Sequence, residues 1–261
     1  MTVSTALRHG DFTSLAKAYV HRPAYARTVL KCLSRHVGRE RAKLTFADVG
    51  AGTGKLTRML LDLGLSGHAV EPNDAMRQEG VAFCGTDSRI AWIAGRAEQT
   101  GLPHGSVDWV TMASSFHWTD ASHALAEFHR VLRPGGAFTV LYNPRDLEND
   151  PLQKEINDGI KAIVPDLKRV TSAAGDLMRH LDGTLTSSGH FGDLLFVEAL
   201  HEEQMTPARY MGVWHSVNDI QVQAGPERWK RILSMIERTI AGMDQIVVRY
   251  RTRSWTVSVL Q

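Results

Sequence analysis

Cysteine is nearly absent from this chain, which holds only Cys32 and Cys84 among its 261 residues. The two lie far apart in sequence and form no CxxC pair, so a disulfide framework is not predicted and a reducing compartment is the simplest setting. The 12 histidines form no HExxH motif and join no Cys/His cluster. We therefore expect no metal site.

Long apolar runs and a strong charge imbalance are also missing. No run of 18 apolar residues exists, so no transmembrane helix and no membrane partner are expected. The stretch MTVSTALRHGDF lacks the apolar core of a secretion signal, which predicts a cytoplasmic protein. Lysine and arginine total 30 against 28 acidic residues, and a net charge of +2 argues against a nucleic-acid partner.

The chain instead shows a regular alternation of short apolar runs and amphipathic stretches up to about residue 142. Strands are predicted at 44–49, 68–72, 89–95, 107–115 and 137–142, and helices at 24–37, 55–63, 73–83 and 120–132. A turn is predicted at 134–136. This alternation is typical of a parallel sheet covered on both faces, which binds ligands beyond the carboxyl ends of its strands.

The alternation breaks after residue 145. Residues 151–182 look helical and loop-rich, 194–205 and 254–260 look like strands, and 226–241 is predicted to be an amphipathic helix that begins at Pro226. We interpret this half as edge strands with helical insertions that roof the ligand face. The expected parts are an N-terminal lid and helix at 1–43, a cofactor-binding core at 44–145, and the remaining strands with the cap at 146–261, all in one structural unit.

A glycine-rich turn indicates a nucleoside ligand. Gly50, Gly52 and Gly54 follow the first predicted strand, where glycines permit a tight turn and a close approach of ligand to backbone. Glu71 ends the next strand, where a carboxylate can accept hydrogen bonds from both hydroxyls of a ribose. The spacing is G-x-G-x-G, whereas dinucleotide sites use G-x-G-x-x-G. A nicotinamide-dependent reductase is therefore the less favoured alternative, and the chain also lacks a Tyr-x-x-x-Lys pair.

The glycine spacing resembles motif I of class I S-adenosylmethionine-dependent methyltransferases. Three later segments, VEPNDAMR, AGRAEQTGLPHGSVDWV and RVLRPGGAFTV, are similar to the segments of that family in the same order. YVHRPAY and FHWTD resemble its small-molecule branch, which includes trans-aconitate methyltransferase-like proteins. The resemblance implies an α/β fold: a Rossmann-like, doubly wound, seven-stranded and mostly parallel sheet, with the last strand antiparallel and with helical cap insertions.

The same resemblance implies a function and a cofactor. The chain would move a methyl group from S-adenosyl-L-methionine to oxygen, nitrogen or carbon of a small organic acceptor by in-line displacement. A non-catalytic protein that only binds S-adenosylmethionine is the other alternative.

The resemblance also assigns cofactor-binding residues. The three glycines would surround the methionine part, Glu71 would hold the ribose, and Arg22 belongs to an N-terminal lid that can pair with the carboxylate of the cofactor. Arg96 departs from the family, which usually has Asp at this position to accept a hydrogen bond from adenine. Arginine cannot accept a hydrogen bond, so Arg96 is not among the predicted cofactor-binding residues. The full predicted set is Tyr19, Arg22, Asp48, Gly50, Gly52, Gly54, Glu71, Ala97, Glu98 and Ser114.

The stretch MASSFHWTD, residues 112–120, includes the end of the fourth predicted strand, which faces the reactive methyl group in this family. His117 has the intrinsic pKa of a general base near neutral pH and is the predicted catalytic residue; alternatively it only shapes the pocket. Asp120 is expected to cap the next helix. The predicted acceptor-binding residues are Phe116, His117, Trp118, Tyr142, Trp214 and His215.

Overall fold

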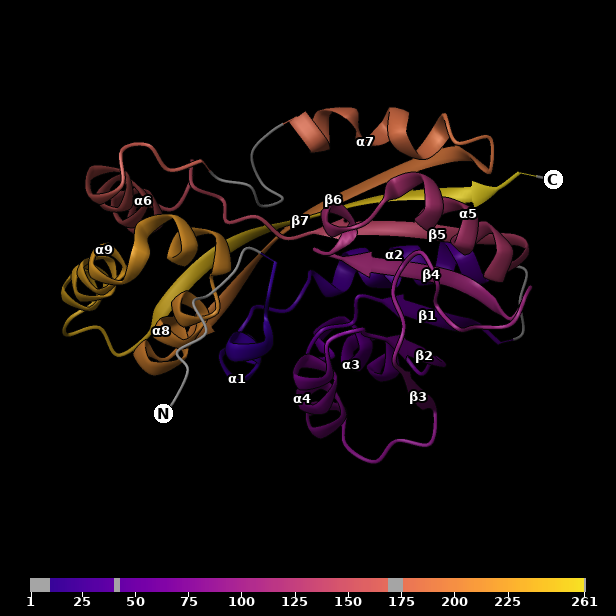
Figure 1. Ribbon diagram of the computed structural model, residues 1–261, viewed down its shortest axis with the longest axis horizontal. Coiled ribbons are helices and arrows are strands. Elements are labelled where there is room, and N and C mark those ends of the chain that lie inside the picture. The colour runs from indigo at the N-terminus through magenta and orange to yellow at the C-terminus, as the bar shows by residue number, and fades with distance from the viewer. Residues whose placement is uncertain (1–9, 40–42, 169–175, 261) are drawn as a thin grey trace, which may run out of the picture.

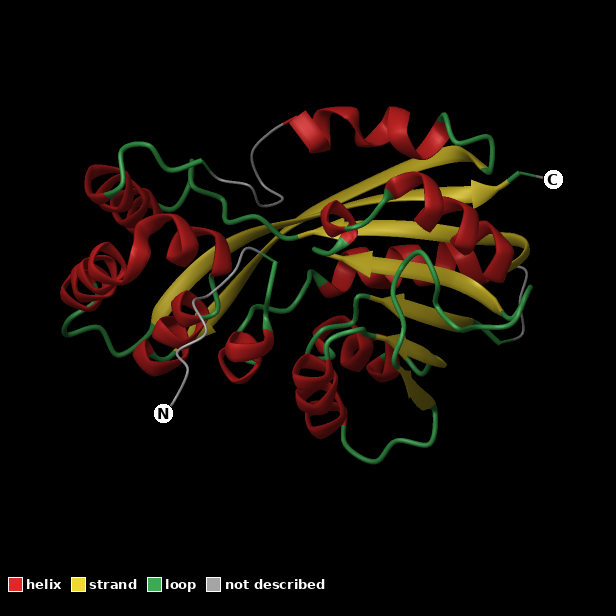
Figure 2. Cartoon of the chain, viewed as in Figure 1, coloured by secondary structure: helices red, strands yellow, loops and turns green. Residues whose placement is uncertain are grey.

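The described residues form one twisted sheet with the strand order β3-β2-β1-β4-β5-β7-β6 (Figures 1 and 2). The computed structural model describes residues 10–39, 43–168 and 176–260. The strands are β1 (Thr45–Val49), β2 (Ser66–Val70), β3 (Ile90–Ile93), β4 (Val107–Ala113), β5 (Leu132–Tyr142), β6 (Phe191–Met205) and β7 (Ile246–Val259). β1 to β5 run parallel, and β7 is antiparallel to both β5 and β6. The predicted fold class, including the antiparallel last strand, is confirmed.

The helices begin and end at the signals that the sequence carries. They are η1 (Thr13–Leu15), α1 (Ala16–Tyr19), α2 (Arg27–Gly38), α3 (Lys55–Asp62), α4 (Asp74–Cys84), η2 (Phe116–Trp118), α5 (Ala121–Val131), α6 (Pro151–Ile163), α7 (Asp176–Thr186), α8 (Pro207–His215) and α9 (Asn218–Thr239). The Asn73 side chain accepts a hydrogen bond from the amide of Met76, and Asp120 accepts one from the amide of His123. The cap at Asp120 was predicted and is confirmed, and Asn73 caps α4 in the same way.

Some of the predicted boundaries differ from those in the structure. The turn at 134–136 lies inside β5 as a bulge, because β4 pairs Val107 with Leu132 and then Trp109 with Ala137. The helix predicted from Pro226 is present, but α9 also includes a helical stretch at 218–224 that was not predicted; Gly225, whose φ is 70°, is non-helical and separates the two. The last two strands begin earlier than predicted, at Phe191 and Ile246.

Charge pairs explain why the start of β7 is hard to recognise in the sequence. Arginines alternate along β7, and a strand with so many charges does not look half-buried. In the structure they pair across to β6: Arg249 Nε lies 2.9 Å from Glu202 and Arg251 Nη1 lies 2.7 Å from Glu198. The opposite charges on neighbouring strands make this extended pairing favourable.

The apolar residues gather in three clusters that follow this architecture. One cluster joins α5 and α7 to one face of the sheet, and a second joins α2 and α3 to the other face. The third cluster lies between α6, α8, α9 and the parts of β6 and β7 that extend past the end of β5. Figure 1 shows these three cap helices together at that end of the long strands. The cap therefore stands over the carboxyl ends of the parallel strands.

Among the helices of the described residues, none combines the length and the apolar character that a membrane crossing requires.

Candidate active site

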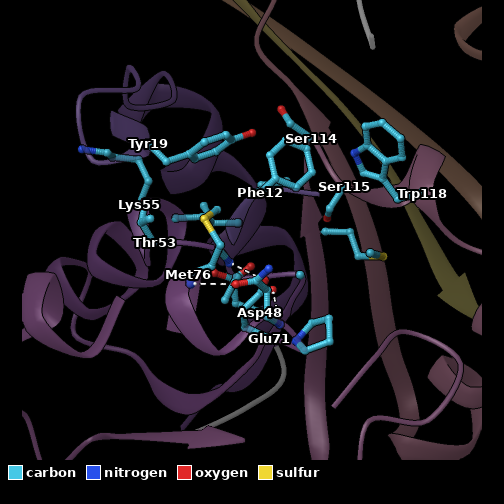
Figure 3. Close-up of a pocket in the computed structure, with 18 of the residues that line it drawn as sticks. Phe12, Tyr19, Asp48, Thr53, Lys55, Glu71, Met76, Ser114, Ser115 and Trp118 are labelled. Carbon is cyan, nitrogen blue, oxygen red and sulfur yellow. Dashed lines mark hydrogen bonds between the residues drawn. The ribbon is translucent and has the colours of Figure 1, made fainter. Parts of the chain in front are cut away.

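A cavity of about 400 Å³ opens at the carboxyl ends of β1, β2 and β4 (Figure 3). It is called the first cavity below. Its floor is formed by the glycine-rich turn after β1 and by Glu71 after β2. Figure 3 shows Phe12 and Tyr19, from the N-terminal segment, across the cavity from Glu71. The ends of the parallel strands thus form a ligand site where the topology predicts one.

The glycines of the turn have two different functions. Gly50 and Gly52 line the first cavity with positive φ values of 67° and 58°. A Cβ on Gly50 would lie 2.7 Å from Ser115 Oγ, so this position cannot carry a side chain without movement. Gly54 does not line the cavity; a Cβ there would lie 2.9 Å from Cys84 Sγ, because α3 and α4 pack closely at this point.

Glu71 is held by two backbone amides. Its Oε2 accepts a hydrogen bond of 2.8 Å from the amide of Gly52, and its Oε1 accepts one of 2.9 Å from the amide of Asn73. Burial raises the pKa of the carboxyl, and these two hydrogen bonds oppose that rise. A carboxylate has about four acceptor positions, so the fixed group can still accept hydrogen bonds from a ligand.

Asp48 supports the turn from below. Its carboxylate accepts hydrogen bonds from Thr57 Oγ1 at 2.6 Å and from Thr111 Oγ1 at 3.2 Å. Burial raises the pKa of Asp48 to about 7, and the hydrogen bonds from the two threonines lower it. These contacts tie β1 to α3 and β4, and they hold the glycine turn in place under the cavity.

Arg96, Ala97 and Glu98 form the far wall of the first cavity. The backbone of Arg96 pairs with that of Gln99 through two hydrogen bonds of 3.1 Å, which fixes this short loop. Glu98 Oε1 accepts a hydrogen bond of 2.9 Å from the amide of Asp120. Glu98 therefore keeps its second oxygen as the side-chain acceptor on this wall, where Arg96 has none to offer.

A second cavity of about 330 Å³ adjoins the first, between the ends of β4 and β5 and the cap helices. His117, Trp118 and Trp214 line it. The His117 ring lies 4.8 Å from the Trp118 ring and 5.9 Å from the Tyr142 ring, centroid to centroid. The residues common to both cavities are Phe12, Tyr19, Arg22, Pro23, Ser114, Trp118 and Asn143.

Ser114 lies at the boundary between the cavities in a strained conformation. Its φ is 55°, which is uncommon for a residue other than glycine. Two contacts hold it: its amide donates a 2.8 Å hydrogen bond to Leu141 O, and its hydroxyl lies 3.3 Å from the Tyr25 hydroxyl. Burial raises the pKa of Tyr25, so that phenol stays protonated and can donate. Backbone strain of this kind is concentrated at functional sites.

Arg22 connects the N-terminal segment to the cap. Its Nε donates a 2.6 Å hydrogen bond to Ser216 Oγ, and its Nη2 donates a 3.0 Å hydrogen bond to Ser216 O. Its guanidinium carbon lies 4.8 Å from the centroid of the Tyr19 ring. The N-terminal segment thus reaches across both cavities and is fastened at the end of α8.

The core of the chain is similar to a known protein family. Residues 47–140 match a family model described as a methyltransferase domain. This part of the chain is therefore similar to a methyltransferase domain. The region contains the glycine turn, Glu71, the 96–98 wall and the end of β4.

Relatives extend the similarity beyond this domain. An uncharacterized methyltransferase of Mycobacterium tuberculosis is 37% identical over 147 residues, which are 56% of this chain and 57% of the relative. A ubiquinone/menaquinone biosynthesis C-methyltransferase of Hahella chejuensis is 37% identical over 108 residues, which are 39% of this chain and 43% of that protein. The matches therefore span 57% and 43% of the lengths of these two curated relatives.

Solved structures share the fold across nearly the whole chain. A proposed type II methyltransferase from Anaeromyxobacter dehalogenans has a TM-score of 0.61 at 23% identity and covers 91% of this chain and 97% of its own. A phosphoethanolamine N-methyltransferase of Haemonchus contortus, in complex with S-adenosyl-L-methionine, has a TM-score of 0.53 at 15% identity, covering 95% of this chain and 57% of its own. Both likenesses describe the fold.

The structure brings together the predicted cofactor-binding residues, with one exception. Gly54 is the residue outside the wall, for the packing reason given above. The others line the first cavity: Tyr19, Arg22, Asp48, Gly50, Gly52, Glu71, Ala97, Glu98 and Ser114.

Three of the predicted acceptor residues do not line the second cavity. Phe116 is 2% exposed and packs in the core against Phe138, with 5.6 Å between ring centroids. Tyr142 is fully buried beside Trp255. His215 is exposed near the end of α8 and is not part of the wall. In the sequence, a ring that packs in the core looks the same as a ring that lines a pocket.

Four polar residues that line the second cavity were not predicted from the sequence. Gln153, Asn157 and Lys161 line it at i, i+4 and i+8 along α6, and Arg145 lines it from the loop after β5. The sequence signal for them is a row of polar residues at helical spacing, next to the row of apolar residues that α6 buries. Solvent-facing polar stripes look identical in sequence, so the stripe alone does not predict a pocket.

Proposed function

We propose that this chain is an S-adenosylmethionine-dependent methyltransferase that acts on a small organic acceptor. The observation that carries the proposal is the pair of adjoining cavities that meet at Ser114 and Trp118. The first has the features of a nucleoside site, and the second brings His117 to the same junction. In this arrangement cofactor and acceptor lie end to end, as an in-line displacement requires.

The residues of the first cavity fit this cofactor. Gly50 and Gly52 leave the backbone open to the methionine part, and Glu71 is fixed to accept from the ribose hydroxyls. The amide of Ala97 and the free oxygen of Glu98 face the adenine edge in this proposal. When bound, the cofactor supplies an electrophilic methyl group on sulfur. The protein contributes position, and holding two reactants in line can supply about 7–11 kcal/mol of the barrier.

His117 is the proposed general base. It would take the proton from an acceptor oxygen or nitrogen that arrives protonated, because its intrinsic pKa suits that task near neutral pH. Its place in the wall of the second cavity, next to the shared Trp118, supports the assignment. An acceptor that arrives already ionised needs no base, and His117 would then only shape the pocket.

A small acceptor fits the second cavity better than a polymer. Its volume of about 330 Å³ is typical of small-molecule sites. Two methyltransferases similar to this chain are named for small substrates, one in ubiquinone and menaquinone biosynthesis and one for phosphoethanolamine. The methylated atom in this proposal is oxygen, nitrogen or carbon.

The cofactor assignment is tested by a thermal-shift comparison. S-adenosylhomocysteine at about 100 times its Kd is expected to stabilise the folded protein by about 2.7 kcal/mol. NAD(H) and NADP(H) at the same concentrations are expected to have no effect, because the turn lacks the dinucleotide spacing. A shift with a nicotinamide cofactor and none with S-adenosylhomocysteine would favour the reductase alternative and reject the proposal.

Closure of the N-terminal segment is tested by hydrogen exchange. Residues 12–25 line both cavities, and Thr13 Oγ1 accepts a 2.9 Å hydrogen bond from Asn73 Nδ2 beside the ribose site. Saturating S-adenosylhomocysteine is expected to slow amide exchange across 12–25 and to leave α2, which lines neither cavity, unchanged. Equal exchange of residues 12–25 with and without ligand would show that the segment is ordinary packing and not a lid.

A further inference from the structure

Three buried donors in the wall of the second cavity have no well-placed hydrogen-bond acceptor among the described residues. They are Arg145 Nε, Trp214 Nε1 and the Tyr250 hydroxyl. Trp214 and Tyr250 are each 3% exposed. Buried polar groups in folded proteins are nearly always paired, so each such group needs an explanation. Three of them in one wall indicate that a bound molecule supplies the acceptors.

The structure holds Arg145 firmly in this position. Its guanidinium carbon lies 4.4 Å from the centroid of the Trp214 ring, and its backbone forms a β-bridge with Tyr250. The adjacent Asp146 does not neutralise it, because the Asp146 carboxylate lies 3.6 Å from the guanidinium of Arg251. Arg145 instead acts on Tyr250, where its charge and a poorly aligned hydrogen bond to the hydroxyl oppose the rise in pKa that burial causes. The proton of the Tyr250 hydroxyl still has no acceptor among the described residues.

The charged residues in the wall favour an anion. Arg22, Arg145 and Lys161 are cationic, and Asp219 is the acid among the described lining residues, which leaves an excess of two positive charges. Arg22 is bonded to Ser216. Arg145 is stacked on an indole ring and forms no ion pair with a described acid, so it is the cation best placed to bind a ligand.

We propose that the acceptor carries an anionic oxygen group, a carboxylate or a phosphate, that binds to Arg145, Trp214 and Tyr250. This group is remote from the atom that is methylated, which lies at the junction beside Ser114 and His117. The guanidinium fork matches either anion, and such charge-assisted hydrogen bonds are the strong ones. The inference rests on the proposed function, since it names the acceptor class of the same site.

Titration calorimetry on the protein saturated with S-adenosylhomocysteine tests this assignment. The probes are benzoate, succinate and inorganic phosphate, with benzamide and succinamide as neutral matches. We expect at least one of the three anions to bind. If it is benzoate or succinate, it should bind at least tenfold more tightly than the matching amide. Binding of benzoate or succinate identifies a carboxylate site, and binding of phosphate alone identifies a phosphate site. No binding by any anion, or amides that bind as well as the acids, would overturn the proposal.

Variants assign the binding to this wall. Arg145→Gln is expected to weaken binding of the anion about 10- to 100-fold, as the loss of charged hydrogen bonds predicts. Trp214→Phe keeps an aromatic ring, removes the indole N–H and is expected to weaken binding by a smaller factor. Arg231→Gln, on the exposed side of α9, is the matched control and should bind like the wild type. Wild-type affinity in both Arg145→Gln and Trp214→Phe would show that the anion binds elsewhere.

The cofactor titration separates two kinds of failure. If the wild type does not bind S-adenosylhomocysteine, the proposed function itself is wrong. If it binds S-adenosylhomocysteine and none of the anions, the function stands and the anionic acceptor is wrong.

Discussion

Glu71→Gln is expected to weaken S-adenosylhomocysteine binding at least 100-fold, although the side chain keeps its size. Both oxygens of Glu71 accept from backbone amides, those of Gly52 and Asn73. Glutamine must turn its NH2 group toward one of these N–H donors, so donor faces donor and the loop loses a fixed point. The ribose loses its charged acceptor as well. Hydrogen bonds to a charged group are worth about 1.5–3 kcal/mol each, and 1.4 kcal/mol is a factor of ten.

Titration calorimetry with S-adenosylhomocysteine measures this loss. Glu237→Gln makes the same chemical change at an exposed position of α9 and should bind the cofactor like the wild type. Thermal unfolding of both variants without ligand checks that each is folded. A folded Glu71→Gln protein with an affinity within fivefold of the wild type would mean that the ribose lies elsewhere.

Local sequence signals were sufficient for the first cavity. Glycines directly after one strand, with an acid at the end of the next strand, are typical of a nucleoside site. The parallel strands bring these residues together at one edge of the sheet. The limit of such signals is seen at Gly54. It has the same positive φ as Gly50 and Gly52 and lies in the same motif, yet it serves the packing of α3 on α4. Only the neighbour that a Cβ would meet distinguishes the two functions.

The second cavity could not be assembled from local signals, because segments distant in sequence form it. Phe116 and Trp118 are two residues apart, yet one packs in the core and the other is 38% exposed at the junction of the cavities. Arg145 reaches the cavity because its loop runs along β7, with its bridge to Tyr250. That part of β7 was not predicted to be a strand, since its charges are balanced by glutamates of β6. The position of Arg145 therefore depends on a pairing that the sequence conceals.

His117→Ala is expected to lower the turnover rate about 10²- to 10⁴-fold, the usual contribution of a positioned general base. His117 lines the second cavity and not the first, so affinity for S-adenosylhomocysteine should change no more than a few-fold. Transfer of labelled methyl from S-adenosylmethionine to the acceptor found by the anion screen or a metabolite screen measures the rate. His123→Ala is the matched control, because His123 is exposed on α5 and lines neither cavity.

The pH profile separates a base from a pocket wall. A base is needed only while the acceptor arrives protonated, so the deficit of His117→Ala should shrink as the pH rises toward the pKa of the acceptor. A residue that only shapes the pocket would give a deficit that does not depend on pH, seen mainly in KM. Turnover equal to that of the wild type from pH 6 to 9 would exclude the base. The acceptor would then arrive ready to react, and His117 would only shape the pocket, while the remote anionic group would still bind to the cationic wall around Arg145.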